Sequence, residues 1–149
     1  RRKGWHVRDL SLQQLLLARL TAMPEDEREA ISSREVRLQS RGAERSFAYV
    51  SEHLKPLLEG PNGLARDIVG VVDQLVEAHP GEQDRSVVFL SRLGSLYPFA
   101  RPSAFFGALA DRTRQVSVVL LYPGERSDDG LSFLGKLTPD RDYRARVYP

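Results

Sequence analysis

Two nearly unbroken apolar runs stand at the centre of the sequence, at residues 87–90 and 116–121. β-Branched runs of this length are typical of strands that are covered on both faces, as in a parallel sheet. Between the runs, Gly94 permits a tight turn, and Ser103 is placed to cap a short helix. This stretch therefore predicts a βαβ unit, which in a parallel sheet has a right-handed crossover.

The N-terminal residues predict a strand that leads directly into a helix. Residues 5–10 alternate in part, and the strand is expected to stop at Ser11. Ser11 forms an S-x-x-Q capping box with Gln14, and Leu10 and Leu15 are placed to form a hydrophobic staple around the same helix start.

Three further helices are predicted before the second strand. The first runs from Pro24 to about Gly42 and is so polar that we expect it on the surface. Apolar residues spaced three and four apart over residues 47–57 predict the second helix, which Pro56 should kink or end. The third begins near Pro61 and stops at the His-Pro-Gly sequence of residues 79–81.

After the second apolar run, the chain turns at Pro123 and Gly124 and crosses a polar loop that contains Glu125. Residues 131–137 and 143–148 are each interpreted as an edge strand. No repeat and no long linker divides the sequence. We therefore predict a single α/β domain over residues 1–149: a small, mainly parallel sheet flanked by helices, Rossmann-like or P-loop-like in topology, with a helical segment between its first and second strands.

Composition and charge exclude several kinds of site. The 149 residues include no cysteine, which excludes Cys-zinc sites, thiol nucleophiles and disulfides. No two of the three histidines are four residues apart, so the spacing does not indicate a histidine-based metal site. The 22 basic and 20 acidic residues are mixed along the chain and form no basic block. No apolar run approaches the ~18 residues of a membrane span, so we expect a cytoplasmic protein that does not contact a membrane.

One phosphate-binding motif is nearly matched, and we reject it. Residues 130–137 spell G-x-x-x-x-G-K-L, with Leu137 in the place where a P-loop needs a serine or threonine hydroxyl for magnesium. Pro139 also disfavours the helix that should follow such a loop. The third strand ends in Tyr122 rather than in a metal-binding acid. With no other catalytic pattern in the sequence, we expect neither a cofactor nor an enzymatic activity.

The candidate binding positions follow from the sheet. In open parallel sheets, ligands and partners bind beyond the carboxyl ends of the strands. The polar, aromatic or glycine residues at these ends are Arg8, Asp9, Gly94, Tyr97, Arg101, Tyr122, Gly124 and Glu125. A purely structural role is the alternative. In that case Tyr97 and Phe99 pack the turn, and Arg101 forms an internal ion pair with Asp9 or Glu125.

The same stretches resemble the C-terminal part of the BrxB family, which belongs to the bacteriophage-exclusion (BREX) defence systems. The resemblance rests on residues 89–101 (FLSRLGSLYPFAR), 118–125 (VVLLYPGE), 131–137 and 142–145 (DYRA). Residues 5–17 also resemble the family's earlier strand and leucine-rich helix. The residues that fall on the family pattern are Gly94, Tyr97, Pro98, Phe99, Arg101, Pro123, Gly124, Gly135, Tyr143, Arg144 and Ala145. Family members usually carry a Ser-His pair after the arginine, whereas this chain has Pro102 and Ser103, so no role of that histidine carries over.

The resemblance implies a small defence protein without established catalytic activity, which contacts larger components such as the PglZ phosphatase-like protein. It also implies an earlier strand and helix, and we expect the sequence to be a fragment because it does not begin with methionine. Our interpretation is a non-enzymatic interaction subunit that uses the motif residues together with Tyr122 and Glu125. Two alternatives stay open: a nucleic-acid-binding module that uses Arg141, Arg144 and Arg146, and a degenerate nucleotide sensor at the strand ends near Gly94 and Gly124.

Overall fold

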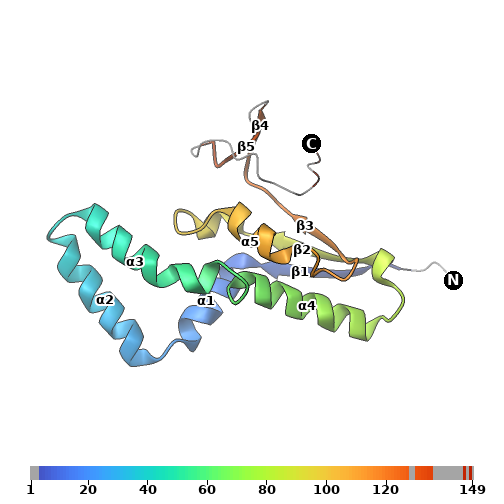
Figure 1. Cartoon of the computed structure of the whole chain (residues 1–149), viewed down its shortest axis with the longest axis horizontal. Helices are drawn as coiled ribbons and strands as arrows, with labels where there is room; N and C mark the ends of the chain where they lie inside the picture. The colour runs from blue at the N-terminus through green and yellow to red at the C-terminus, as the bar shows by residue number, and fades with distance from the viewer. Residues whose placement is uncertain (1–3, 128–129, 136–145, 147, 149) are drawn as a thin grey trace.

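The computed structural model describes residues 4–127, 130–135, 146 and 148. These residues form a three-stranded sheet, a group of helices and a separate two-stranded ribbon (Figure 1). In chain order the elements are β1 (His6–Ser11), α1 (Leu12–Ala22), α2 (Glu25–Gln39), α3 (Ala43–Leu58), α4 (Leu64–Ala78), the 3₁₀ turn η1 (Gln83–Arg85), β2 (Ser86–Ser91), the 3₁₀ turn η2 (Leu93–Leu96), α5 (Pro102–Leu109), β3 (Ser117–Leu120), β4 (Gly124–Ser127) and β5 (Gly130–Phe133).

The sheet is parallel, with β2 in the middle between β1 and β3. His6 is in register with Ser86 of β2, and Leu90 of β2 is in register with Leu120 of β3. The amide of Leu121 donates to the carbonyl of Leu90 at 3.0 Å and extends the pairing past β3. The α/β class, the parallel sheet and the helical segment between the first two strands are thus confirmed.

The predicted helix boundaries are confirmed at some ends and corrected at others. The amide of Gln14 donates to Ser11 Oγ at 3.3 Å, as the capping box requires. Helix α3 continues two residues past Pro56, because a proline in the last turn removes only one intrahelical hydrogen bond. Helix α5 begins at Pro102 with Arg101 as its N-cap, so Ser103 is not the cap. The fixed φ of proline suits this first helical position.

The hydrophobic core lies between the sheet and helices α1, α4 and α5. The amphipathic face of α4 contributes Ile68, Val72 and Leu75, which are almost fully buried, and α1 contributes Leu12. These side chains pack with the alternate residues of β2. Helix α2, by contrast, has no buried residue, as its polar sequence predicts. It forms a hairpin with α3 that extends away from the sheet (Figure 1).

Only one face of the sheet is covered by the helices of the described chain, so the expectation of two covered faces is wrong. Val88 and Leu90 of β2 point into the core and are fully buried. On the opposite face, Val7 of β1 and Val119 of β3 are exposed, and Val87 lies outside the core cluster. The cause is the strand order: two successive right-handed crossovers that step in the same direction place both connections on one side of the sheet.

The C-terminal part differs from its predicted arrangement. Glu125 lies in β4 and not in a loop, and β4 pairs antiparallel with β5. Residues 131–133 therefore belong to a separate ribbon instead of extending an edge of the parallel sheet. The strand predicted at residues 143–148 falls almost entirely outside the described residues. None of the helices in the described ranges combines the length and the apolar content needed to cross a membrane.

Candidate interaction site

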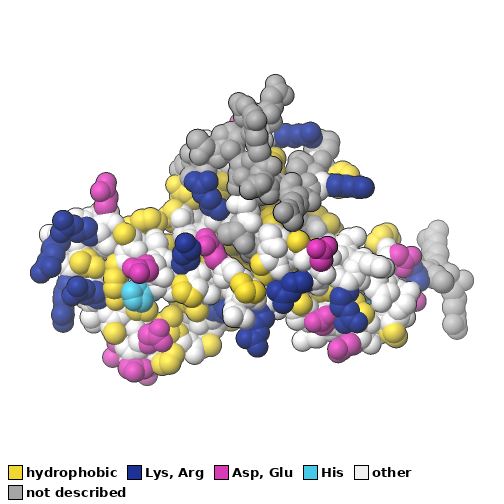
Figure 2. All heavy atoms as spheres, in the orientation of Figure 1, with side chains coloured by type: hydrophobic (Ala, Val, Ile, Leu, Met, Phe, Trp, Pro, Cys, Tyr) yellow, Lys and Arg dark blue, Asp and Glu magenta, His cyan; other side chains and the backbone are white. Residues whose placement is uncertain are grey.

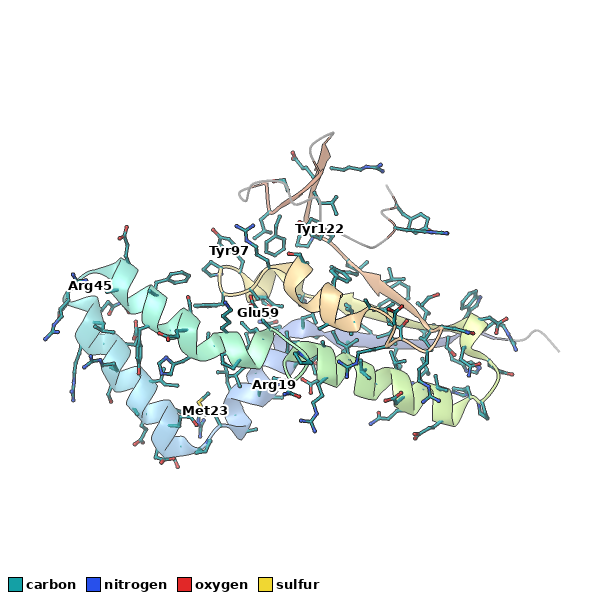
Figure 3. All side chains as sticks on the ribbon, viewed as in Figure 1. Arg19, Met23, Arg45, Glu59, Tyr97 and Tyr122 are labelled. Atoms are coloured by element: carbon teal, nitrogen blue, oxygen red, sulfur yellow. The ribbon has the colours of Figure 1, made fainter. Side chains whose placement is uncertain are left out.

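The predicted strand-end residues Tyr97 and Tyr122 meet beyond the carboxyl ends of β2 and β3. Both rings lie against Phe133 of β5, with centroid distances of 6.2 and 5.7 Å, and Phe133 is buried in the core (Figure 3 labels both tyrosines). The Tyr122 hydroxyl donates to the carbonyl of Leu131 at 3.5 Å. Tilted aromatic contacts of this kind stabilise packing. The two tyrosines thus anchor the β4–β5 ribbon to the sheet.

The two glycines predicted at the same strand ends differ in what they require. A Cβ atom at Gly124 would collide with the carbonyl oxygen of Ser132 on the paired strand. At Gly94, a Cβ atom would make ordinary contacts of 3.8 and 3.9 Å with side-chain atoms of Leu134 and Pro123. The close approach of β4 and β5 therefore requires glycine at position 124, whereas position 94 has room for a larger residue.

Arg101 does not form the predicted internal ion pair. Its side chain is exposed and makes no ion pair with Asp9 or Glu125, so that expectation is wrong. Asp9 instead accepts a hydrogen bond from Ser91 Oγ at 3.0 Å across β1 and β2. The Arg101 guanidinium therefore remains available to a binding partner.

The remaining motif residues are spread over several places. Phe99 stacks on Phe47 of α3 with a centroid distance of 5.5 Å, and so it joins the motif segment to the helical hairpin. Pro98 is exposed and follows a cis peptide bond. Arg146 is exposed. The candidates Arg141, Tyr143 and Arg144 lie outside the described residues.

The largest departure from the sequence analysis is an apolar surface that we name the open sheet face. It consists of Trp5, Val7, Val119 and Leu121, which are 64%, 48%, 38% and 57% exposed, around Val87 and Phe89 of the central strand. All these positions have odd numbers, and Val7 is in register with Val87 and Phe89 with Val119, which places them on the side of the sheet opposite the core. The parity of the apolar positions in β1 and β3 is the sequence signal that could have revealed this surface.

A second apolar feature is a groove of about 540 Å³ between α2, α3 and the end of α1, which we name the hairpin groove. Its apolar lining includes Met23 at the α1–α2 turn, Ile31 of α2, Phe47 and Val50 of α3, and Phe99 (Figure 3 labels Met23). The buried hydroxyl of Ser46 donates to Glu35 Oε1 at 2.9 Å and joins the two helices beside this groove.

The C-terminal part of α2, the turn after it and the first turn of α3 carry a group of arginines that we name the arginine tip. Figure 2 shows their dark blue side chains at the end of the hairpin, and Figure 3 labels Arg45 there. The group consists of Arg34, Arg37, Arg41 and Arg45, which are all exposed and form no ion pair within the described ranges. These arginines alternate with other residues in the sequence, so they gather only once the hairpin has formed.

Comparison with known protein families covers almost the whole chain. The family model for the BREX protein BrxB matches residues 9–147, from β1 to beyond the β4–β5 ribbon. Among curated proteins, and among solved structures, no significant match is found. The resemblance predicted from residues 5–17 and 89–147 is thus confirmed, and the match also covers the helices between these two stretches. The chain therefore belongs to the BrxB family of BREX proteins, and its biological role lies in BREX phage defence.

Proposed function

We propose that this chain is a non-enzymatic interaction subunit of a BREX defence complex and that it binds its partner through the open sheet face. The observation that carries the proposal is the side of the all-parallel sheet that no described helix covers, where Val7 is exposed on one edge strand, Val119 on the other, and Leu121 directly after it. Parallel sheets are almost always covered on both faces, because both faces are apolar. An apolar surface of this kind on a folded domain marks a binding site.

The width of the open sheet face fits one helix. Three strands about 4.8 Å apart span about 10 Å, which matches the diameter of an α-helix. We therefore expect the partner to contribute an amphipathic helix whose apolar stripe packs on Val7, Val119 and Leu121. Asp9 lies on the same side of the sheet, in register with Phe89 and Val119, and its carboxylate adds a polar contact that selects a hydrogen-bond donor on the partner. We propose a PglZ-like protein as the partner.

The strand ends support an interaction role over a catalytic one. This is where an open α/β fold would bind a substrate or cofactor. Here the side chains of Tyr97 and Tyr122 are used in packing against Phe133. A nucleotide sensor finds no support at the same place either, because Gly94 faces Leu134 and Pro123, and Gly124 faces Ser132.

Co-expression of the full-length protein with the other components of its defence system tests the proposal. We expect a stable complex in size-exclusion chromatography with light scattering, and we expect Leu121→Asp to weaken it about tenfold or more, because burial of one leucine contributes about 1.5–3 kcal/mol. Val36→Asp is the matched control, since Val36 is 61% exposed on α2, away from the sheet, and Leu121 is 57% exposed. Equal complex formation by both variants would contradict the proposal.

Labelling distinguishes a partner bound on the open sheet face from another segment of the full-length polypeptide that covers the same residues. A cysteine introduced as Val119→Cys should react with a thiol reagent in the free full-length protein and become protected when the partner binds. The 149 residues contain no cysteine, so within them the label reports on position 119 alone. Protection of the cysteine in the free protein would overturn the proposal.

A second candidate function is nucleic-acid binding through the arginine tip. Four exposed arginines without acidic partners in the described chain form a surface that suits phosphate contacts. If three of them each neutralise one phosphate of duplex DNA, the logarithm of the affinity should fall with the logarithm of salt concentration with a slope of about −2.7. The variant with Arg37, Arg41 and Arg45 changed to alanine should lose this binding, while Arg66→Ala on α4 should keep it. Absence of binding at low salt would exclude the candidate.

A further inference from the structure

We propose that His6, His79 and Glu82 form a binding site for a divalent transition-metal ion, with Zn²⁺ as the preferred ion among those available to a cell. The three residues come from the start of β1, the C-cap of α4 and the loop before η1. One ligand atom from each lies within 4.8 Å of the others. Two imidazoles and one carboxylate are a donor set that zinc accepts, with water at the fourth position of a tetrahedron.

A rigid turn holds two of the three ligands. Residues 79–82 have the sequence His-Pro-Gly-Glu, the Glu82 amide donates to the His79 carbonyl at 3.2 Å, and Gly81 has a φ of +79°. This is a type II turn, in which proline fixes the second residue and glycine supplies the positive φ of the third. The backbone geometry therefore brings His79 and Glu82 together before any ion binds.

The parallel pairing of β1 and β2 supplies the third ligand. His6 is in register with Ser86, which directly follows η1, and the buried Ser86 hydroxyl donates to the Glu82 carbonyl at 2.9 Å. The His6 ring stacks on the His79 ring with centroids 3.5 Å apart and an angle of 14° between the planes. His6 Nε2 lies 2.5 Å from Glu82 Oε2. The ligands thus converge although they are distant in the sequence.

A neighbouring arginine orients the carboxylate. Arg85 Nη2 lies 3.3 Å from Glu82 Oε1, while the other carboxylate oxygen faces His6. In metal sites, a carboxylate ligand is commonly held by a hydrogen bond from a neighbouring group to one of its oxygens, while its second oxygen faces the metal. The side chains of His6 and Glu82 are 22% and 38% exposed, so the site is open to solvent and an ion can enter.

Binding requires one adjustment of the histidine rings. The lone pair of an imidazole nitrogen lies in the plane of the ring, so two stacked rings must rotate before both lone pairs point at one ion. Both histidines are only partly buried, so this rotation meets little resistance from the core. Softer ions with nitrogen preference, such as Zn²⁺, Co²⁺ and Ni²⁺, suit this set, whereas Mg²⁺ and Ca²⁺ prefer all-oxygen sites.

The position of the site indicates a structural role for the ion. It lies at the amino ends of the strands, opposite the edge where parallel sheets bind substrates. An ion there would join the edge strand β1 to the end of α4 and the start of β2. The residue after His6 is Val7 of the open sheet face, so the ion would also fix the strand that contributes to that face. This inference is independent of the proposed interaction role.

Isothermal titration of ZnCl₂ into the tag-free full-length protein, in a buffer that does not bind metals, tests the site. We expect one equivalent of Zn²⁺ to bind and the melting temperature to rise with zinc concentration. His79→Ala should weaken zinc binding by more than about 100-fold. Removal of a residue that only hydrogen-bonds to a metal ligand already lowers metal affinity about 10–100-fold, and His79 is itself a proposed ligand. His53→Ala is the matched control, since His53 contacts Tyr49 on α3, away from the cluster.

Glu82→Gln is the second variant, because it keeps the size of the side chain if His79→Ala fails to fold. It should bind zinc more weakly than the unchanged protein while its circular dichroism spectrum stays the same. Titration with Co²⁺ should give the visible absorption bands of four-coordinate cobalt in the unchanged protein and not in either variant. Absence of zinc binding by the unchanged protein, or an equal loss in His53→Ala, would overturn the proposal and leave an ordinary His6–Glu82 pair.

Discussion

Arg19 connects three parts of the fold through a single guanidinium group. Its Nε and Nη2 atoms donate to the two carboxylate oxygens of Asp67 at 2.6 and 3.1 Å. Nη1 and Nη2 also donate to the carbonyls of Asn62 and Gly63 at 2.9 and 2.7 Å (Figure 3 labels Arg19). Asp67 lies in the first turn of α4, where a negative charge is favourable. One side chain of α1 thus fixes the start of the main core helix.

Arg19→Lys should destabilise the protein by about 2 kcal/mol, because an ammonium group cannot make the two-pronged contact with Asp67 and reach the carbonyls at the same time. Urea denaturation measures the change. Arg66→Lys is the control: Arg66 is exposed on the same helix, and its replacement should change stability by less than about 0.5 kcal/mol. Equal stability of both variants would show that the Arg19 contacts contribute nothing.

Two glycine-to-alanine changes should act in opposite directions. Gly124→Ala forces the new Cβ atom against the Ser132 carbonyl, and we expect it to destabilise the β4–β5 ribbon by about 1–3 kcal/mol. Gly70→Ala adds a Cβ atom in open space on α4 and should stabilise the helix by about 0.5–1 kcal/mol. Thermal denaturation of both variants provides the comparison. A gain in stability from Gly124→Ala would contradict the ribbon geometry.

At the level of elements, α2 is loosely attached to the fold, whereas α3 places Leu54 and Leu58 in the core. Helix α2 buries none of its residues. The Ser46 hydroxyl of α3 donates a hydrogen bond to the Glu35 side chain of α2. The hairpin groove lies between apolar residues of the two helices. Segments with few buried contacts open locally at a low free-energy cost.

Ser46→Ala should therefore loosen α2 without unfolding the core. Loss of one hydrogen bond should lower the free energy of opening of α2 by about 1 kcal/mol. The α2 amides should therefore exchange with deuterium about fivefold faster, while exchange of the α4 amides should not change. Hydrogen–deuterium exchange by mass spectrometry resolves the two helices. Ser40→Ala removes only a hydrogen bond to the carbonyl of Arg37 in the same turn and should leave exchange across α2 nearly unaltered. Faster exchange in both α2 and α4 of Ser46→Ala would show that α2 and the core open together.

Short sequence patterns, such as caps and the spacing of apolar residues, predicted most helices and strands. They did not predict which distant segments contact one another. The Ser11 cap fixed the start of α1, and the polar pattern predicted the surface position of α2. Strand β4 was missed because Pro123 and Gly124 are typical of a turn, and residues 124–127 become a strand only by pairing with β5. His6 and His79 were likewise dismissed because a spacing rule detects only ligands on one helix, whereas these two meet through strand pairing.

For the whole molecule, the sequence predicted the fold class and family, and it missed the open face of the sheet. The apolar run of β2 is typical of a strand covered on both sides. In the structure, neighbouring strands shield Val87 even without a second layer of helices. Only the edge strands show that one face of the sheet is open, because Val7 and Val119 remain exposed there. The strand-end residues Tyr97 and Tyr122 contact Phe133, and a sequence pattern alone does not distinguish such a packing contact from a binding position.

The open sheet face has a consequence for the life of the protein in the cell. Chaperones and proteases recognise exposed apolar segments, and Trp5, Val7, Val119 and Leu121 present such a surface on a folded chain. If the open sheet face binds a partner as proposed, a copy synthesised in excess of that partner would be cleared, and its abundance would follow that of the partner. The ratio of subunits in the defence complex would in this way be set by degradation of unassembled copies, without a dedicated regulator.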